Sequence, residues 1–307
     1  KPIANTLEGC AKIESTAKKY GRKAIVCHVL RFTPFYSAVK DVIDAGELGD
    51  IVTVSTSENV GYYHQAHSFV RGPWRNSGSS SPMILAKCCH DMDLLRWLIG
   101  KKCEKAASFG NLTYFRKEDA PAGCAKYCSQ CPLTDCIYKA QKIYREYPWM
   151  AKYFCNDEDD AAVQKALQGS QYDRCVFYSD NDVVDHQVSI FKFEGGITAS
   201  HTMTAFSSRI YREIKVHGTK AELVGNMEDN FLELRVLGGD TKVIPIDVGH
   251  VTGNHGGGDS GLMHDLYLER NGIPVKNITY LDVSLDSHKM AFAAEKARLT
   301  EQTVDVL

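Results

Sequence analysis

The stretch "DHQVSIFKFEGGITASHTMTAF" (residues 185–206) decides the fold class, because it places two short strand-like segments on either side of a Gly195–Gly196 turn. Further segments of this kind follow it, namely "REIKVHG", "AELVGN", "FLELRVL" and "KVIPIDV". Short strands joined by turns are typical of a largely antiparallel sheet. A helix, "SHKMAFAAEKARLT" (287–300), comes after them. We therefore predict a mostly antiparallel open sheet with helices on one face.

The beginning of the sequence has a different character. It predicts a helix within residues 1–21, a strand at "KAIVCHVLRF" (23–32) and a second helix at "FYSAVKDVIDAGELG" (35–49). A continuous apolar run rich in branched residues is typical of a strand buried in a parallel sheet, and its neighbours would come from earlier repeats. We therefore expect an α/β plus α+β protein. Residues 1–33 would be the C-terminal remnant of a doubly wound α/β domain. Residues 34–307 would be a second domain with a cysteine-rich insertion at about 116–180.

The composition excludes several classes of protein. The 307 residues are 44% hydrophobic and 24% charged, as in soluble globular proteins. The net charge of −2, without a long basic run, predicts no binding of nucleic acid. No stretch approaches the roughly 20 apolar residues of a membrane span, and no signal peptide opens the sequence. The odd count of 11 cysteines then favours a reducing, cytoplasmic setting, in which cysteines are metal ligands or core residues.

The segment "ILAKCCHDMDLLRWLIG" (84–100) predicts a helix that carries chemistry on one side. Lys87 and His90 follow each other on one face, and Asp93 lies one turn beyond His90. A histidine oriented by a carboxylate can act as a general acid or base, and a nearby ammonium can hydrogen-bond a substrate oxygen. The alternative is an ordinary amphipathic helix with Lys87 and Asp91 in solvent, which the helix pattern alone favours. The buried stripe would consist of Leu85, Cys88, Cys89, Met92, Leu95 and Ile99.

Three stretches together resemble the Gfo/Idh/MocA oxidoreductases, which include glucose–fructose oxidoreductase and inositol dehydrogenases. They are "HVLRFTPFYSAVKDVIDAGELGDIVTV" (28–54), "HDMDLLRWLIG" (90–100) and "SHKMAFAAEKARLT" (287–300). Lys1 and Pro2 resemble the end of the Glu-Lys-Pro motif of that family. The resemblance implies that residues 1–33 are the C-terminal remnant of a dinucleotide-binding domain. Residues 34–307 would then be the substrate and oligomerisation domain, built on a mostly antiparallel sheet. One departure is that the Asp-x-Gly-x-His pattern of the family has Ala86 and Cys88 at its first two fixed positions.

The implied function is NAD(P)-dependent transfer of hydride between nicotinamide and a hydroxyl of a sugar or polyol. The resemblance makes His90 the general acid/base and places Lys1 between nicotinamide and substrate, with Pro2 on the cofactor side. Lys87 would be a second polar contact that substitutes for the missing aspartate. Arg31 would either touch the cofactor or brace the domain junction. The main binding site for NAD or NADP would lie outside this sequence, so we expect the fragment alone to be inactive.

Two non-redox uses of the same scaffold remain as alternatives. One is an NAD-dependent glycosidase that borrows hydride chemistry, and the other is a sugar-binding module without catalysis. The missing aspartate keeps both alternatives open. A homo-oligomer is expected in each case, because an open sheet face usually pairs.

Two polar loops are further candidates for binding. Residues 61–82 form a loop dense in polar and aromatic groups, and the resemblance implies substrate contacts there at Tyr63, His67, Arg71 and Trp74. Exposed loop aromatics also make oligomer contacts. The late "GGGDSG" (256–261) fits a G-x-G-x-x-G pattern but opens no βαβ unit, so we reject it as a phosphate loop. Around it, His250, His255 and Asp259 would form a surface loop or close over a substrate.

The segment "CAKYCSQCPLTDC" predicts a metal centre through the spacing of Cys124, Cys128, Cys131 and Cys136. Cysteines spaced C-x3-C-x2-C-x4-C match tetrahedral zinc ligation, and such a centre would be structural because it leaves no open position. A segment with little apolar content would then be folded by the ion. An iron–sulfur cluster has similar ligand needs. Reduced thiols in a loop are the remaining alternative.

Overall fold

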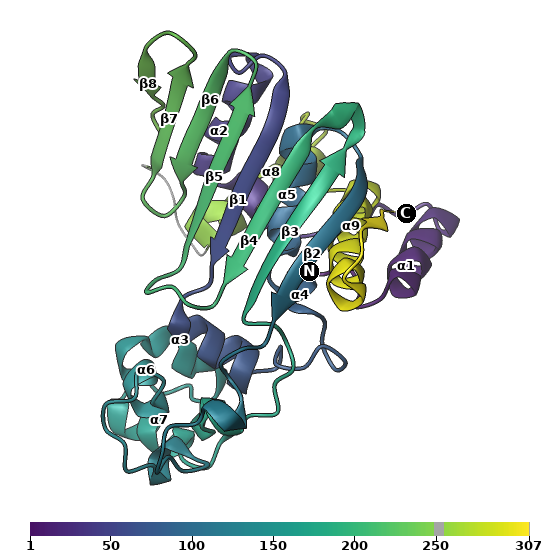
Figure 1. The fold of residues 1–307 in the computed structure, drawn as a ribbon. Coiled ribbons are helices and arrows are strands. Elements are labelled where there is room, and N and C mark those ends of the chain that lie inside the picture. The colour runs from purple at the N-terminus through teal and green to yellow at the C-terminus, as the bar shows by residue number, and fades with distance from the viewer. Residues whose placement is uncertain (249–254, 307) are drawn as a thin grey trace.

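The computed structural model describes residues 1–248 and 255–306, which form one sheet with helices behind it and a smaller lobe at one end (Figure 1). The strand order is β8-β7-β6-β5-β1-β4-β3-β2-β9. Among the strand pairs of the described residues, β1 and β4 run parallel and the others run antiparallel. The strands are β1 (Ile51–Asn59), β2 (Cys103–Asn111), β3 (His186–Phe193), β4 (Thr198–Thr204), β5 (Tyr211–Gly218), β6 (Ala221–Asn226), β7 (Phe231–Val236), β8 (Thr241–Val243) and β9 (Val304–Asp305).

Alternation of side chains gives the sheet one buried and one open face. In β3, Phe191 and Phe193 are buried, whereas Val188 and Ile190 between the inward positions are exposed. Successive side chains of a strand point to opposite faces, so the outward set must face solvent or a partner. The mostly antiparallel open sheet predicted from the sequence is confirmed.

The helices cover the buried face, as Figure 1 shows for α2, α5, α8 and α9. The long helix α9 (Leu281–Thr300) packs on β2 and on α5 (Cys89–Ile99). The other helices on this side are α1 (Leu7–Lys19), α2 (Pro34–Asp44), α4 (Met83–Ala86) and α8 (Gly258–Arg270). In the described residues, no helix is both long enough and apolar enough to cross a bilayer.

The predicted strand at 23–32 is wrong. Its first half makes a single bridge between Ile25 and Tyr280, and its second half is the 3-10 turn η1 (Val29–Phe32). A strand needs continuous pairing on at least one side, and the described residues offer this segment only a short contact, in which the Val26 amide donates to the Thr279 carbonyl at 2.9 Å. The apolar side chains are instead buried beneath the helices. The domain boundary after residue 33 stays a prediction.

The cysteine-rich unit, residues 116–180, forms the smaller lobe. It contains α6 (Ala140–Glu146), α7 (Asp160–Leu167) and the 3-10 turn η5 (Pro148–Tyr153). The expectation of little apolar content is wrong, because Tyr144, Met150 and Leu167 belong to a second hydrophobic cluster. Tyr63, Ala66 and Val70 join this cluster, so the unit shares its apolar core with the neighbouring helical segment.

Candidate active site

The predicted helix 84–100 is broken in its middle. Helix α4 ends at Ala86 and α5 begins at Cys89, with Lys87 and Cys88 between them. The predicted buried stripe is confirmed, and Asp91 is buried as well, so the alternative with Asp91 in solvent is wrong. The break turns Lys87 toward β1, where its Nζ lies 3.2 Å from Glu58 Oε1.

A buried network of charges connects this helix to the sheet. Arg212 of β5 contacts Glu58, and its Nε donates to Asp91 Oδ1 at 3.1 Å. Burial alone would lower the pKa of Arg212, but the two carboxylates outweigh it and raise that pKa, so the guanidinium stays charged. With Lys87, the network contains two cations and two anions and is neutral as a whole.

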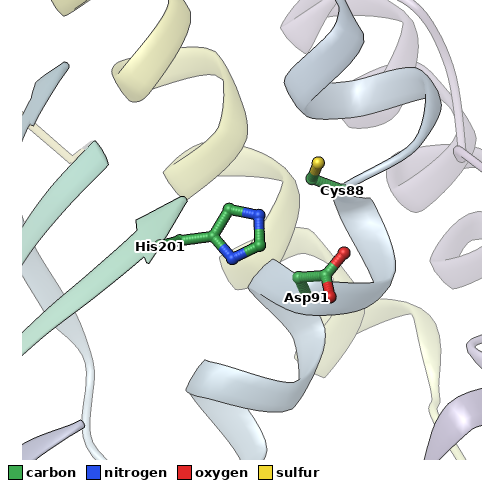
Figure 2. A group of neighbouring side chains, drawn as sticks. All are labelled: Cys88, Asp91 and His201. Carbon is green, nitrogen blue, oxygen red and sulfur yellow. The ribbon is translucent and has the colours of Figure 1, made fainter. Parts of the chain in front are cut away.

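Cys88, Asp91 and His201 meet beside this network, and their side chains point toward one another (Figure 2). Their nearest ligand atoms lie within 4.8 Å of one another. The His201 Nδ1 is 2.9 Å from the Thr56 hydroxyl. However, Asp91 is already paired with a guanidinium, and the His201 Nδ1 contacts the Thr56 hydroxyl. We therefore interpret this trio as buried packing and not as a cation site.

A row of histidines lies on the other side of α5. The His28 ring is 5.8 Å from the His90 ring and 5.7 Å from the His288 ring. The His288 Nε2 accepts from the Ile3 amide at 2.9 Å, while its Nδ1 lies 2.7 Å from the Ser284 carbonyl, so the Nδ1 carries the proton. The Lys1 Nζ donates to the Ala86 carbonyl at 3.3 Å, which brings the first residues next to α4.

His90 is a neutral base in this setting. Burial first, and then the Lys1 charge, hold the pKa of His90 well below its usual value. Burial likewise lowers the pKa of His28 to about 4. The Nδ1 of His90 has no hydrogen-bond partner among the described residues. A neutral imidazole has one unprotonated nitrogen, which can accept a proton from a hydroxyl.

Asp93 does not orient His90, contrary to the prediction. Its two carboxylate oxygens each accept a 2.6 Å hydrogen bond from Arg31, and both side chains are buried. The Arg31 guanidinium also lies 5.2 Å from the centroid of the Trp97 ring. Of the two roles expected for Arg31, the geometry favours bracing η1 against α5 over contact with a cofactor.

A cleft of about 970 Å³ opens next to this cluster. His255 lines it and lies 6.0 Å from the His90 ring, so the histidine row reaches the cleft wall. Lys87 and Arg212 bring the charge network to the same wall. Trp149 and Tyr153, both about half-exposed on η5, form the wall that the cysteine-rich unit contributes. His250 lies outside the described residues.

The four substrate contacts predicted in residues 61–82 do not line the cleft. The predicted loop is helical, with α3 (Tyr62–His64) followed by a π-helical segment at Gln65–Arg71 whose residues are all buried. His67 contacts the Tyr144 hydroxyl at 3.0 Å, and Tyr63 stacks on Tyr147 at 3.7 Å. Arg71 is bound within the cysteine-rich unit. Trp74 packs against the main core.

The sequence analysis missed several residues of the cleft. They are His64, Arg212, Trp149 and Tyr153, together with Glu58, which is buried behind the cleft wall as the partner of Arg212. Arg212 and Asp91 are 121 residues apart in the sequence, and no local pattern links them. His64 lies in the stretch 61–82, in which the resemblance implies substrate contacts at other residues.

Two glycines of "GGGDSG" allow close packing between helices, which agrees with the prediction that this stretch is not a phosphate loop. A Cβ at Gly258 would lie 2.3 Å from the Val29 carbonyl oxygen, and one at Gly261 would lie 2.6 Å from that of Phe32. These glycines let α8 approach η1 closely. This loop is therefore packed against η1 and is not a cradle for phosphates.

Comparison with protein families gives one extended match. Residues 40–282 match the model of the oxidoreductase family, C-terminal alpha/beta domain, of the Gfo/Idh/MocA group. The Bacillus subtilis (strain 168) protein YteT, provisionally named as an oxidoreductase, is 25% identical over 290 residues, which are 88% of this chain and 66% of YteT. Inositol 2-dehydrogenase of Pseudomonas fluorescens (strain SBW25) is 31% identical over 101 residues, covering 32% of this chain and 26% of that protein. The chain thus spans less than two thirds of the length of these curated relatives.

Solved structures share the fold over the whole chain. A levoglucosan dehydrogenase, solved in complex with NADH and levoglucosan, superposes with a TM-score of 0.67 at 15% identity. The superposition covers 100% of this chain and 72% of that one. At this identity the likeness concerns the fold.

Proposed function

Because the chain belongs to the Gfo/Idh/MocA oxidoreductase family through its C-terminal alpha/beta domain, we propose that the protein transfers a hydride between NAD or NADP and a hydroxyl-bearing carbon of a sugar or polyol. The observation that carries this proposal is the state of His90. Its imidazole is buried, neutral and unpartnered at Nδ1, beside the Lys1 ammonium. That combination is what removal of a hydroxyl proton requires.

The residues of the chain divide the proton chemistry between them. A bound nicotinamide would supply the acceptor for the hydride that leaves the carbon. The neutral His90 takes the hydroxyl proton, and the C–O bond becomes a carbonyl. Lys1 donates a hydrogen bond to the same oxygen and stabilises the negative charge that develops on it. Lys1 has donors to spare for this, since an ammonium has three and one is used on the Ala86 carbonyl.

The charges of the cleft favour a neutral substrate. Lys87 and Arg212 lie at its wall, but Glu58 and Asp91 offset both cations. An acidic sugar would find no unpaired cation in this network, whereas sugar hydroxyl groups could hydrogen-bond to Lys87 and Arg212, which line the cleft. The half-exposed rings of Trp149 and Tyr153 provide a surface for the apolar face of a sugar ring.

We also propose that the protein is a homo-oligomer through its open sheet face. Phe109 and Val188 are cross-strand partners on that face, and their side chains are 65% and 43% exposed. Ile190 beside them is 56% exposed. A cytoplasmic location is proposed from the eleven cysteines, all of which are free thiols in this structure. A structural zinc ion, expected from the cysteine spacing, would take no part in hydride transfer.

The test is a turnover assay on the protein as the cell makes it, with NAD+ or NADP+ and a panel of neutral sugars and polyols. Formation of reduced nicotinamide is followed by absorbance. We expect His90→Asn to lower kcat by roughly 100- to 10,000-fold, the usual contribution of a general base. The matched control is His217→Asn, because His217 is partly exposed on the open face, away from the cleft.

Three outcomes would contradict the proposal. Full activity of His90→Asn would remove His90 from the chemistry. Glycoside cleavage that needs bound NAD but shows no net reduction would make the protein a glycosidase. Sugar binding without any turnover would make it a binding module.

A further inference from the structure

Five cysteines from two separate segments surround one small cavity in the cysteine-rich unit. Its lining includes the four cysteines singled out by their spacing, and it also includes Cys175, which is 39 positions beyond Cys136. The backbone holds this arrangement, since Tyr127 and Arg174 form a β-bridge and the Cys175 amide donates to the Lys126 carbonyl at 2.9 Å. The convergence of the thiols is therefore a property of the fold and not only of sequence spacing.

A buried cation lies against these thiols without a carboxylate to compensate it. Arg71 is only 1% exposed. Its Nε donates to the Arg174 carbonyl and its Nη2 to the Tyr138 carbonyl, both at 2.6 Å, while Nη2 also lies 3.5 Å from the Cys128 sulfur. Across residues 1–248 and 255–306, Arg71 forms no ion pair, and its Nη1 has no partner. A buried charge without a counter-charge is strongly destabilising.

The buried carboxylate of this unit does not supply that counter-charge. Asp173 is fully buried and accepts hydrogen bonds from the Ser129 amide at 2.8 Å, the Gly169 amide at 3.1 Å and the Gln141 side chain at 3.3 Å. Its oxygens are thus used by neutral donors. The groups that remain next to Arg71 and can carry negative charge are the thiols.

We propose that four of the five thiols bind one zinc ion as thiolates, with Cys128 as a ligand, and that Arg71 offsets part of the charge of this centre. Four thiolates around Zn²⁺ carry a net charge of −2, which is the counter-charge that the guanidinium lacks. The thiols are not preorganised for the ion. In the described residues, the trio Cys88, Asp91 and His201 alone has ligand atoms within 4.8 Å of one another, so no three sulfurs around this cavity lie that close together. Zinc would therefore draw the sulfurs closer together.

The size of the cavity selects a single ion. Its volume is about 20 Å³, which is room for one water-sized occupant. The centre is structural, because four thiolates leave no open position on the metal. It lies in the same unit as Trp149 and Tyr153, so it would hold the aromatic wall of the cleft in place.

The experiment is to measure metal in the protein purified under reducing conditions without chelator. Native and denaturing mass spectrometry of the wild type should differ by one zinc ion per chain. Cys128→Ser should reduce the zinc content at least tenfold, and at least three of the variants at Cys124, Cys131, Cys136 and Cys175 should do the same. Cys27→Ser is the matched control, because Cys27 is exposed and remote from the unit, and it should retain one zinc ion.

Two further measurements keep the proposal falsifiable if a variant fails to fold. The reduced wild type, stripped of metal, should take up one Co²⁺ and gain the intense near-ultraviolet bands of sulfur-to-cobalt charge transfer. A wild type that contains no zinc and takes up neither Zn²⁺ nor Co²⁺ would overturn the proposal. So would iron together with acid-labile sulfide in the place of zinc, or full zinc retention in Cys128→Ser.

Discussion

Arg212 and Arg71 are both buried guanidinium groups, yet the chain compensates them in opposite ways. Arg212 lies between Glu58 and Asp91, and Lys87 completes a neutral set at the cleft wall. Among the residues that the structure describes, the hydrogen-bond partners of Arg71 are carbonyl oxygens and the Cys128 sulfur. In the sheet domain the counter-charge is thus part of the polypeptide, whereas in the cysteine-rich unit the polypeptide provides thiols that become anionic when a metal displaces their protons.

The sheet domain and the cysteine-rich unit are therefore stabilised in different ways. The network around Arg212 consists of side chains that the polypeptide itself supplies. The environment of Arg71 depends on an ion that the chain must acquire. Loss of that ion should therefore affect the cysteine-rich unit and its wall of the cleft first, and leave the sheet domain folded.

The largest effect is expected when Arg212 is removed. Arg212→Met leaves Glu58 and Asp91 buried with one fewer cation, and the free energy of unfolding should fall by about 3 to 5 kcal/mol. Urea unfolding followed by circular dichroism measures this change. Arg209→Met is the control, because Arg209 forms an exposed pair with Asp229 near the same strand, and its loss should not shift the midpoint measurably. Equal effects of the two substitutions would show that Arg212 is not electrostatically essential.

A smaller effect is expected from acid, through the histidine next to Arg71. Burial first, and then the Arg71 charge, lower the pKa of His67 to about 4. In the unfolded chain the pKa of His67 is about 6.5. Between pH 6.5 and 4, His67 is therefore protonated in the unfolded chain but mostly neutral in the folded protein. Stability is therefore lost as the pH falls from 6.5 toward 4, by about 2 to 3 kcal/mol at pH 4.5 for this group.

The variant His67→Gln isolates this contribution. Its unfolding midpoint should fall less between pH 7 and pH 4.5 than that of the wild type. His217→Gln, in which the replaced side chain is partly exposed on the open face, should follow the wild type. An identical acid dependence of His67→Gln and the wild type would mean that the pKa of His67 is not lowered by folding.

The smallest effect is expected in zinc affinity on removal of Arg71. Arg71→Met deletes the cation next to the thiolate centre, and the affinity for Zn²⁺ should weaken roughly 10- to 100-fold, as when other supporting groups of metal sites are lost. Arg71→Lys should recover part of this loss, since it restores the charge. Competition with a chromophoric chelator measures the affinity. An unchanged affinity in Arg71→Met would separate the arginine from the metal.

The sequence was informative wherever the signal was local. Strand β3 could be placed from its apolar alternation, and the buried stripe of α5 from its helical spacing. The convergence of Cys124, Cys128, Cys131 and Cys136 followed from their closeness in the sequence.

The rest depended on contacts between distant segments. Nothing near Cys175 or Arg212 in the sequence indicates which cavity or carboxylate each will meet. The polar segment 65–71 resembled a surface loop, because its composition does not reveal that the cysteine-rich unit would cover it. The strand expected at 23–32 failed for a related reason, since an apolar run specifies burial but not a pairing partner.

The most direct test of the difference between the two buried arginines is X-ray absorption at the zinc edge of the purified, reduced protein. We expect zinc in a shell of four sulfur atoms at about 2.3 Å, the distance of zinc thiolates. A shell dominated by nitrogen and oxygen would contradict this account, as would the absence of zinc from a protein whose cysteine-rich unit is fully folded. Either result would leave Arg71 buried without a counter-charge from the thiols.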